Sequence, residues 1–345
     1  MTSADIIGVV DISEDEIKNW IPDLLNVLLR DHSAKHDAKI GSSNPDEHHI
    51  IWATDSYETL GNCYNKRAQI RAELITGKNG RVIRPRAVKT KVEQQTRTRN
   101  KAEVFTPSWV CNAQNNLIDN EWFGRIGVFN TENNDKTWTT NPEKITFPEG
   151  KTWIDYVKDC RLEITCGEAP YLVSRYDTVT GEYIPVEKRI GLLDRKLRVV
   201  NENTSTPDEW VPYAHLALAS VYGYEWQGDS LLLAREAALC TFMDHFWQKF
   251  PNENLFDKTI IKSAYIISWN LWQMDGLKGK IPYSEKVVIN TDLYGSEEKT
   301  IEEGVYCEIL SWKLEPNKKG ILNLRKDKKS QFFSTSLCLS KKYKK

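Results

Sequence analysis

The sequence lacks the features that would assign it to a secreted, membrane-bound or zinc-binding class. Its seven cysteines are scattered, odd in number and never spaced as CxxC, which indicates neither a disulfide framework nor a zinc site. No apolar run approaches the roughly 20 residues that a membrane helix needs. The opening stretch MTSADIIGVVDISED has no signal-peptide pattern of basic and apolar regions. We therefore expect a cytoplasmic protein with no metal and no membrane partner.

The sequence does contain a core-forming composition with strongly separated charges. Its 345 residues, 40% of them hydrophobic, are enough for one large or two modest domains. The net charge is only −1, but residues 1–60 hold 4 Lys/Arg against 12 Asp/Glu, residues 66–101 hold 12 against 2, and residues 313–345 hold 11 against 2. Two basic blocks in a near-neutral chain are typical of a polyanion-binding protein. Solvated loops or tails are the alternative.

The stretch from 81 to 101, RVIRPRAVKTKVEQQTRTRNK, has few apolar residues and no sustained period. This composition predicts an exposed basic arm. Phosphate contacts from such an arm would supply affinity for double-stranded DNA without reading its sequence. The residues that we expect to make these contacts are Arg84, Arg86, Lys89, Lys91, Arg97 and Arg99.

Residues 102–119, AEVFTPSWVCNAQNNLID, predict a capped helix. Thr106 is a good N-cap, and Pro107 suits the first helical position. Apolar side chains then fall near one helical face: Trp109, Val110, Ala113, Leu117 and Ile118. The segment is either an ordinary capped helix or a Phe-Thr-Pro corner whose backbone and threonine face a ligand.

The stretch RLEITCGEAPYL begins with a predicted strand, residues 161–165, that carries Glu163 near its carboxyl end. Cys166 and Gly167 predict a turn, and the pattern is typical of strand, turn and helix. Ligands of open α/β sheets bind beyond the carboxyl ends of the strands, and a glycine there lets the backbone approach a ligand closely. One glycine is much weaker evidence than GxGxxG. A plain β-turn before a packed tyrosine is the alternative.

Two further apolar segments also end in an acidic corner. ASVYGYEW, 219–226, predicts a strand that ends at Glu225, and 227–250 predicts a long amphipathic helix. An acid at the end of such a strand can accept both ribose hydroxyls of a nucleoside. SAYIISWNLWQMDGL, 263–277, closes with Asp275, and periodicity leaves open whether its first half is a strand or a helix. Each acid alone could equally be a local turn-former.

In this order the segments resemble the S-adenosylmethionine-dependent, adenine-specific DNA methyltransferases of restriction–modification systems. Thr106 and Pro107 stand where that family has a Phe-Thr-Pro type motif. LEITCGEAPYL resembles the family's first-strand motif, with matching positions at Glu163, Cys166 and Gly167 among others. The stretch from 102 to 277 is similar to proteins known as restriction endonuclease subunit M.

The resemblance implies a fold and a set of cofactor contacts. The fold would be α/β, with a Rossmann-like methyltransferase sheet, complete or incomplete, and a mixed N-terminal region. S-adenosylmethionine would contact Thr106, Glu163, Cys166 and Gly167, and Glu225 would hold its ribose. Asp275 would meet its adenine ring. The implied parts of the chain are an N-terminal region, 1–80, a basic arm, 81–101, a methyltransferase-like domain, 102–290, and a C-terminal extension with a basic tail, 291–345.

Three departures from the family pattern limit what the resemblance implies. Ala169 stands where the family has a second glycine, and Glu168 adds a carboxylate to the loop. The Asn-Pro-Pro-Tyr type tetrapeptide, which orients the amino group of the flipped base, occurs nowhere in the sequence. The chain therefore either works with a second polypeptide, such as another methyltransferase or endonuclease subunit, or is truncated. No catalytic residue is assigned.

Two other classes of function remain open. The first is a DNA-binding or assembly subunit of a restriction–modification complex without turnover of its own, which the basic blocks and the absent tetrapeptide favour. The second is an α/β protein whose acids only form turns.

Overall fold

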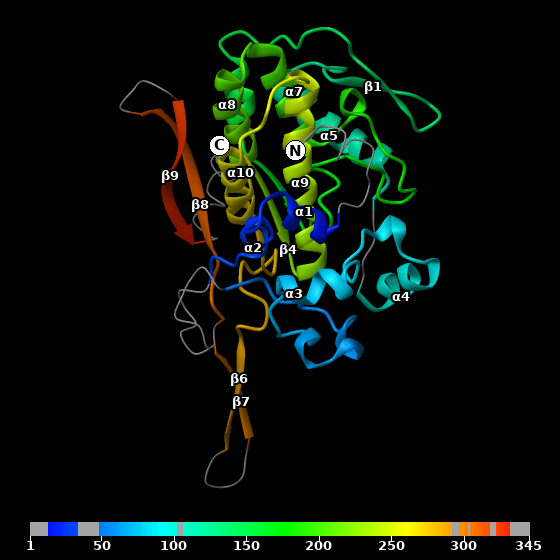
Figure 1. Ribbon diagram of the computed structural model, residues 1–345, viewed down its shortest axis with the longest axis vertical. Coiled ribbons are helices and arrows are strands. Elements are labelled where there is room, and N and C mark those ends of the chain that lie inside the picture. Colours follow the sequence, from blue (N-terminus) through cyan, green and yellow to red (C-terminus); the bar gives the residue numbers. More distant parts are fainter. Residues whose placement is uncertain are drawn as a thin grey trace.

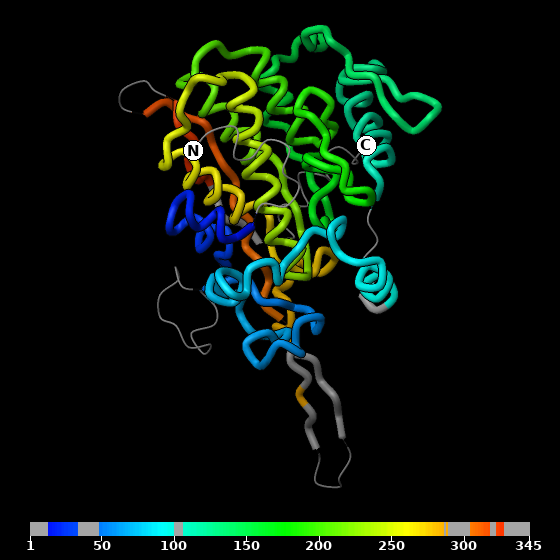
Figure 2. The backbone as a smooth tube through the Cα atoms, turned by 45° about the vertical axis from the view of Figure 1, so that its right-hand side comes forward, coloured from blue at the N-terminus to red at the C-terminus, as the bar shows by residue number. Residues whose placement is uncertain are grey.

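The computed structural model describes residues 13–33, 48–101, 106–291, 297–302, 304–317 and 322–331. A small parallel sheet lies at the centre, surrounded by helices, with two hairpins extending along one side and below (Figure 1). Figure 2 shows the N-terminal segment, in blue, beside the segment around residue 260, in yellow. The α-helices are α1 Glu14–Trp20, α2 Leu24–Leu29, α3 Ala72–Ile75, α4 Lys91–Lys101, α5 Ser108–Phe123, α6 Trp153–Lys158, α7 Leu192–Asn203, α8 Pro207–Ala219, α9 Gly228–Lys249 and α10 Asp257–Asn270. Short 3₁₀ turns are η4 Glu58–Leu60, η5 Asn62–Tyr64, η6 Gly77–Asn79, η7 Arg86–Val88 and η8 Val186–Lys188.

The central sheet consists of three parallel strands in the order β3, β4, β5. Their bounds are β3 Arg161–Ile164, β4 Val221–Glu225 and β5 Leu271–Gln273. Glu163 lies opposite Gly223, and Glu225 lies opposite Gln273. Because all three strands are parallel, their carboxyl ends meet at one edge of the sheet. The sequence predicted this α/β class and the first two strands, and the structure confirms both.

Helices make the connections between the parallel strands. α7 and α8 connect β3 to β4, and α9 and α10 connect β4 to β5. α9 contacts both β4 and β5, and every residue from Gly228 to Trp247 is buried. A helix that is buried all round belongs to the core of a protein. The predicted long helix at 227–250 is therefore confirmed, but as a core helix rather than an amphipathic one.

One sequence expectation about neighbouring elements is corrected, and one open alternative is decided. No helix follows the turn at Cys166 and Gly167, because the chain runs through loops and the short turn η8 before α7 begins at Leu192. The segment 263–277, which periodicity left open, is the end of helix α10 followed by strand β5. The helix ends at Asn270 because Leu271 adopts an extended backbone and begins β5. The Asn270 side chain donates to the carbonyls of Leu218 and Val221.

α5 lies in the fold with its polar side inward. Its buried positions include Asn112, Asn115, Asn116 and Asp119, while Leu117 is 69% exposed. The guanidinium of Arg195 on α7 pairs with three of these side chains, through hydrogen bonds to Asp119, Asn112 and Asn116. Buried polar groups are tolerated when they are paired in this way.

The N-terminal helices and the hairpins complete the structure. α1 starts at a capping box between Ser13 and Glu16, and α2 packs on α9 and α10. The β8–β9 hairpin, Glu308–Pro316 with Leu322–Gln331, contacts α8 and α10. The β6–β7 hairpin, Lys286–Thr291 with Glu297–Glu302, projects away from the body, and a small hairpin pairs β1 Asn130–Glu132 with β2 Trp138–Thr140 (Figure 1). None of the helices in the described ranges is both long and apolar enough to cross a bilayer.

Candidate functional site

Glu225, the last residue of β4, connects the loop after β3 to the start of α9. Its Oε2 accepts the N–H of Gly167 at 2.8 Å, and its Oε1 accepts the N–H of Gln227 at 3.0 Å. The side chain is buried, and burial raises the pKa of Glu225 although both N–H groups oppose this effect. The strand-end acid and the turn glycine are therefore joined by a direct hydrogen bond.

Glu163 on β3 holds the far end of the same loop. Its carboxylate accepts the N–H groups of Tyr171 and Leu172 at 3.5 and 3.3 Å. Burial raises the pKa of Glu163 well above its ordinary value, and the negative charge of Glu225 raises it further. The two carboxylates thus interact across one loop. We call Glu163, the 165–172 loop and Glu225 the sheet corner.

The backbone of this loop is strained in a way that turns its N–H groups toward the acids. Thr165, Gly167 and Ala169 have φ values of 54°, 56° and 60°. A side chain at such a φ costs about 1 kcal/mol or more, so only Gly167 adopts it freely. Gly223 of β4 makes room for the loop, because a Cβ there would lie 3.0 Å from the Sγ of Cys166.

α5 supports the sheet corner from the side. The Nδ2 of Asn115 donates to the carbonyl of Tyr171 at 2.9 Å, and Tyr171 is also hydrogen-bonded to Thr106. Thr106 was predicted to cap α5, but the cap residue is Pro107, and Asp177 accepts the N–H of Ser108 at 2.8 Å instead. Thr106 therefore reaches the corner without capping the helix. The preceding Phe105 lies outside the described residues.

Asp275 belongs to a separate turn beyond β5. Its Oδ1 accepts the N–H groups of Leu277 and Lys278, each at 3.0 Å, so this carboxylate forms its own turn. The turn lies against the sheet edge, because a Cβ on Gly276 would come within 2.6 Å of the Ile164 side chain. No hydrogen bond joins Asp275 to Glu163 or Glu225 among the described residues. These contacts of Asp275 match the alternative in which the acid only forms a local turn.

Glu168 connects the sheet corner to the basic segment, residues 81–101. Its Oε1 accepts the backbone N–H of Arg86 at 2.7 Å, and its Oε2 accepts the hydroxyl of Tyr176 at 2.8 Å. The side chain is 2% exposed and therefore points inward, away from the open side of the loop. No sequence pattern indicates the contact with Arg86, because the partners are 82 positions apart.

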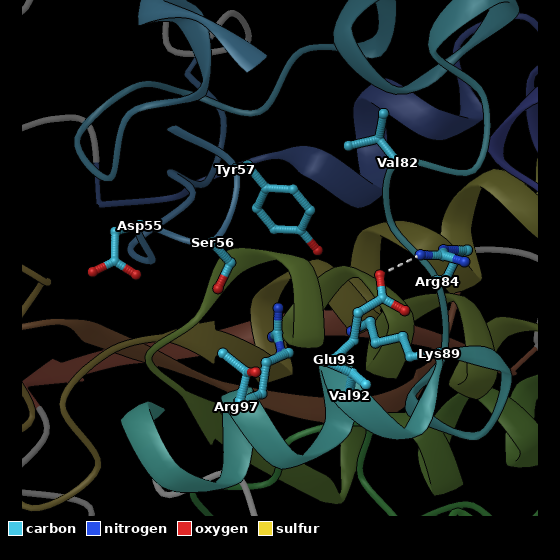
Figure 3. Close-up of a pocket in the computed structure, with 10 residues that line it drawn as sticks. Asp55, Ser56, Tyr57, Val82, Arg84, Lys89, Val92, Glu93 and Arg97 are labelled. Carbon is cyan, nitrogen blue, oxygen red and sulfur yellow. Dashed lines mark hydrogen bonds and ion pairs between the residues drawn. The ribbon is translucent and has the colours of Figure 1, made fainter. Parts of the chain in front are cut away.

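The basic segment is not the exposed arm that its composition predicted. Residues 91–101 form helix α4, and Arg97 and Lys89 are buried. Arg97 and Tyr57 both line a cavity of about 280 Å³. Within it, the side chain of Arg97 points toward Tyr57 (Figure 3). The apolar periodicity is missing because the helix packs through charged side chains, so a hydropathy pattern could not reveal its buried face.

Asp229, in the first turn of α9, is the partner that buries Arg97. Its Oδ2 receives the Nη2 of Arg97 at 2.7 Å and the hydroxyl of Tyr57 at 2.8 Å. Although burial acts to raise it, Arg97 and then Lys89 hold the pKa of Asp229 below its ordinary value. Asp229 was not identified from the sequence as a functional or structural partner. Its position in the first turn of a predicted helix could have indicated it, because an acid there is stabilised by the helix dipole. The sequence analysis expected Arg97 and Lys89 to be exposed phosphate contacts, but both side chains are buried.

The other cations of the basic segment divide into two groups. Arg84 is half-buried and paired with Glu93 at 2.7 Å, and the guanidinium of Arg86 donates to the hydroxyl of Thr98 at 3.0 Å. Lys91 and Arg99 are exposed on α4. These two are the predicted DNA contacts that remain open to solvent.

The sheet corner offers hydrogen-bond acceptors and donors side by side: the buried carboxylate of Glu225, the half-buried carboxylate of Glu163 and the loop N–H groups. Such a set can receive the hydroxyls and the amino-acid end of a nucleoside ligand. Within the described ranges, no group of three or more His, Cys, Asp and Glu residues is arranged to hold a metal ion. No protein-family model, curated protein or solved structure matches the chain.

Proposed function

We propose that this chain is the S-adenosylmethionine-binding part of a DNA adenine methyltransferase of a restriction–modification system. It acts with a second polypeptide. The proposal combines the order of motifs in the sequence with the parallel sheet whose strands β3 and β4 carry Glu163 and Glu225. The sheet would be the Rossmann-like half of the family's fold.

The observation that carries the proposal is the hydrogen bond between Glu225 and Gly167. It joins the acid at the end of one strand to the glycine turn after its parallel neighbour, which is the place where nucleoside cofactors bind to open α/β sheets. The ribose hydroxyls of the cofactor would donate to Glu225 in place of one or both N–H groups that now occupy it. The loop N–H groups so released would face the cofactor.

The chemistry is transfer of a methyl group from the sulfonium of S-adenosylmethionine to the amino nitrogen of adenine. The nitrogen lone pair attacks the methyl carbon, the carbon–sulfur bond breaks with its electrons passing to sulfur, and the nitrogen then loses a proton. The cofactor supplies the reactivity, so the protein contributes binding and orientation. The tetrapeptide that would orient the amino group is absent from this sequence, and we assign it to a partner.

Calorimetry with S-adenosylmethionine tests the cofactor site. We expect saturable binding that Glu225→Ala abolishes and that Glu121→Ala, which removes an exposed glutamate on α5, leaves unchanged. Because Glu225 also holds the loop, Glu225→Gln and a thermal-unfolding control separate loss of binding from loss of folding. No binding at millimolar cofactor would refute the proposal.

A second experiment tests whether the chain is a complete enzyme. We expect the purified chain to transfer little or no labelled methyl group from S-adenosylmethionine to duplex DNA. Robust transfer without a partner would show that another part of the chain replaces the missing tetrapeptide.

A non-catalytic DNA-binding or assembly subunit is the second candidate. The exposed Lys91 and Arg99 favour it, together with the acids of the sheet corner, which are already hydrogen-bonded to the backbone. Salt-dependent binding to duplex DNA by a protein that binds no S-adenosylmethionine would support this candidate over the first.

A further inference from the structure

A second cavity, of about 340 Å³, lies beside the sheet corner and belongs to none of the predicted sites. Three segments line it: the start of α5, the turn of the β1–β2 hairpin, and residues 177–188. Thr106 places it next to the corner, because its carbonyl accepts the hydroxyl of Thr178 at 3.1 Å and the residue is hydrogen-bonded to Tyr171. A ligand in this cavity would lie close to anything bound at the sheet corner.

Three aromatic side chains from separate segments line this cavity: Trp109, Trp138 and Tyr183. Trp109 is 40% exposed, and no ring of the described residues stacks on it. The Nε1 of Trp138 donates to the carbonyl of Lys188 at 2.8 Å, which fixes the edge of its ring. Flat aromatic faces held at a rim are the platforms on which nucleic-acid bases stack.

Lys136 provides a cation at the same rim. It closes the turn of the β1–β2 hairpin, where its φ of 66° is the usual left-handed conformation of the last loop residue. Its ammonium group lies over the Trp109 ring, 5.0 Å from the ring centre. A lysine beside an aromatic platform can meet the phosphate of a stacked nucleotide.

The acidic side chains of the cavity differ in their availability. Asp177 is already occupied, since it accepts the N–H groups of Ser108, Val179 and Thr180. Glu182 is exposed, and its carboxylate makes no hydrogen bond or ion pair within the described ranges. A free carboxylate accepts hydrogen bonds from an exocyclic amino group but not from thymine O4, which is itself an acceptor.

We propose that this cavity binds an unpaired DNA base that carries an exocyclic amino group, stacked on Trp109 with its amino group directed at Glu182. The inference deepens the proposed function, since it takes DNA as the ligand and names a subsite for the base. It does not require the cofactor to bind.

Fluorescence titration without cofactor tests it, using short single strands of oligodeoxyadenylate, oligothymidylate and an abasic strand of the same length. We expect wild-type protein to bind the adenine strand most tightly and the abasic strand least. Trp109→Ala should weaken binding of the adenine strand roughly 5- to 100-fold, the range expected when one stack is removed. Trp109→Phe should restore most of it, and Glu182→Ala should remove the preference for adenine over thymine.

Leu117→Ala is the matched control, because it removes an exposed apolar side chain elsewhere on α5 and should change no affinity. Equal binding of adenine and abasic strands by the wild type would overturn the inference, as would an unchanged affinity in a folded Trp109→Ala protein. Calorimetry with S-adenosylmethionine keeps the two proposals apart. Intact cofactor binding beside a failed base titration refutes the subsite alone.

Discussion

The sheet corner and the basic segment both bury charge, but they neutralise it with different partners. At the corner, Glu163 and Glu225 receive backbone N–H groups from the neighbouring loop. In the basic segment, Arg97 meets the side chain of Asp229, which is 132 positions away along the chain. The corner therefore depends on backbone conformation, whereas α4 is held by a long-range ion pair.

This difference has energetic consequences. A buried carboxylate that accepts N–H groups can take up a proton and stay folded, so its burial shows in the pH dependence of stability. An arginine cannot lose its proton in the accessible pH range. Removing it leaves an unpaired buried charge, which is among the largest single-site penalties in proteins. Four experiments can exploit this contrast, from the largest expected effect to the smallest.

Breaking the long-range pair should have the largest effect. We expect Arg97→Ala to lower the free energy of unfolding in urea by about 3–5 kcal/mol, because it leaves Asp229 buried without its main counter-charge. Arg99→Ala, two positions along the same helix but exposed, should change it by less than about 0.5 kcal/mol. Arg97→Met combined with Asp229→Asn should recover part of the loss. Equal effects at 97 and 99 would contradict the buried pair.

The sheet corner should make the free energy of unfolding depend on pH. The pKa of Glu163 is raised in the folded protein, so the folded state holds a proton that the unfolded state has lost, and stability falls as pH rises from about 4.5 to the folded pKa. The fall is about 1.4 kcal/mol for each unit of the rise. Glu163→Gln keeps an acceptor for the loop and should flatten this dependence, measured by urea unfolding at several pH values. The exposed Glu121→Gln should not alter it.

The exposed cations of the basic segment predict a change in salt dependence. If Lys91 and Arg99 bind phosphates, replacing both with alanine should reduce the slope of log K against log salt for duplex DNA by about 1.8, or about 0.9 for each phosphate that is no longer neutralised. Lys258→Ala, which removes an exposed lysine at the start of α10, serves as the control. An unchanged slope in the double variant would leave these two residues as plain solvated charges.

The smallest effect should come from the strained loop. Thr165 is exposed and β-branched, and its φ is 54°. Thr165→Gly should raise the free energy of unfolding by about 0.5–1 kcal/mol, because glycine adopts this conformation freely. Thr165→Val keeps the branched Cβ and should give no gain. If Thr165→Val raised the free energy of unfolding, the hydroxyl of Thr165 and not its backbone conformation would be the source of the destabilisation.

The predictable parts of the molecule were those determined by local sequence. The strands around Glu163 and Glu225 and the turn at Gly167 follow from short apolar runs and a small residue, and parallel pairing then brings them together. Helix α4 could not be predicted from hydropathy, because its buried side is an arginine that meets an acid far away in sequence. For the same reason, the contact of Glu168 with Arg86 and the burial of the asparagines of α5 could not be predicted, because their partners are also far away in sequence.

The inverted orientation of α5 has a practical consequence for protein engineering. A variant library that follows the usual assumption of apolar inside and polar outside would conserve the wrong positions on this helix. Asn115→Leu should free the carbonyl of Tyr171 and disturb expression of folded protein, whereas Leu117→Lys should be tolerated and improve solubility in concentrated samples. Surface redesign for crystallisation can therefore begin at the hydrophobic residues of α5.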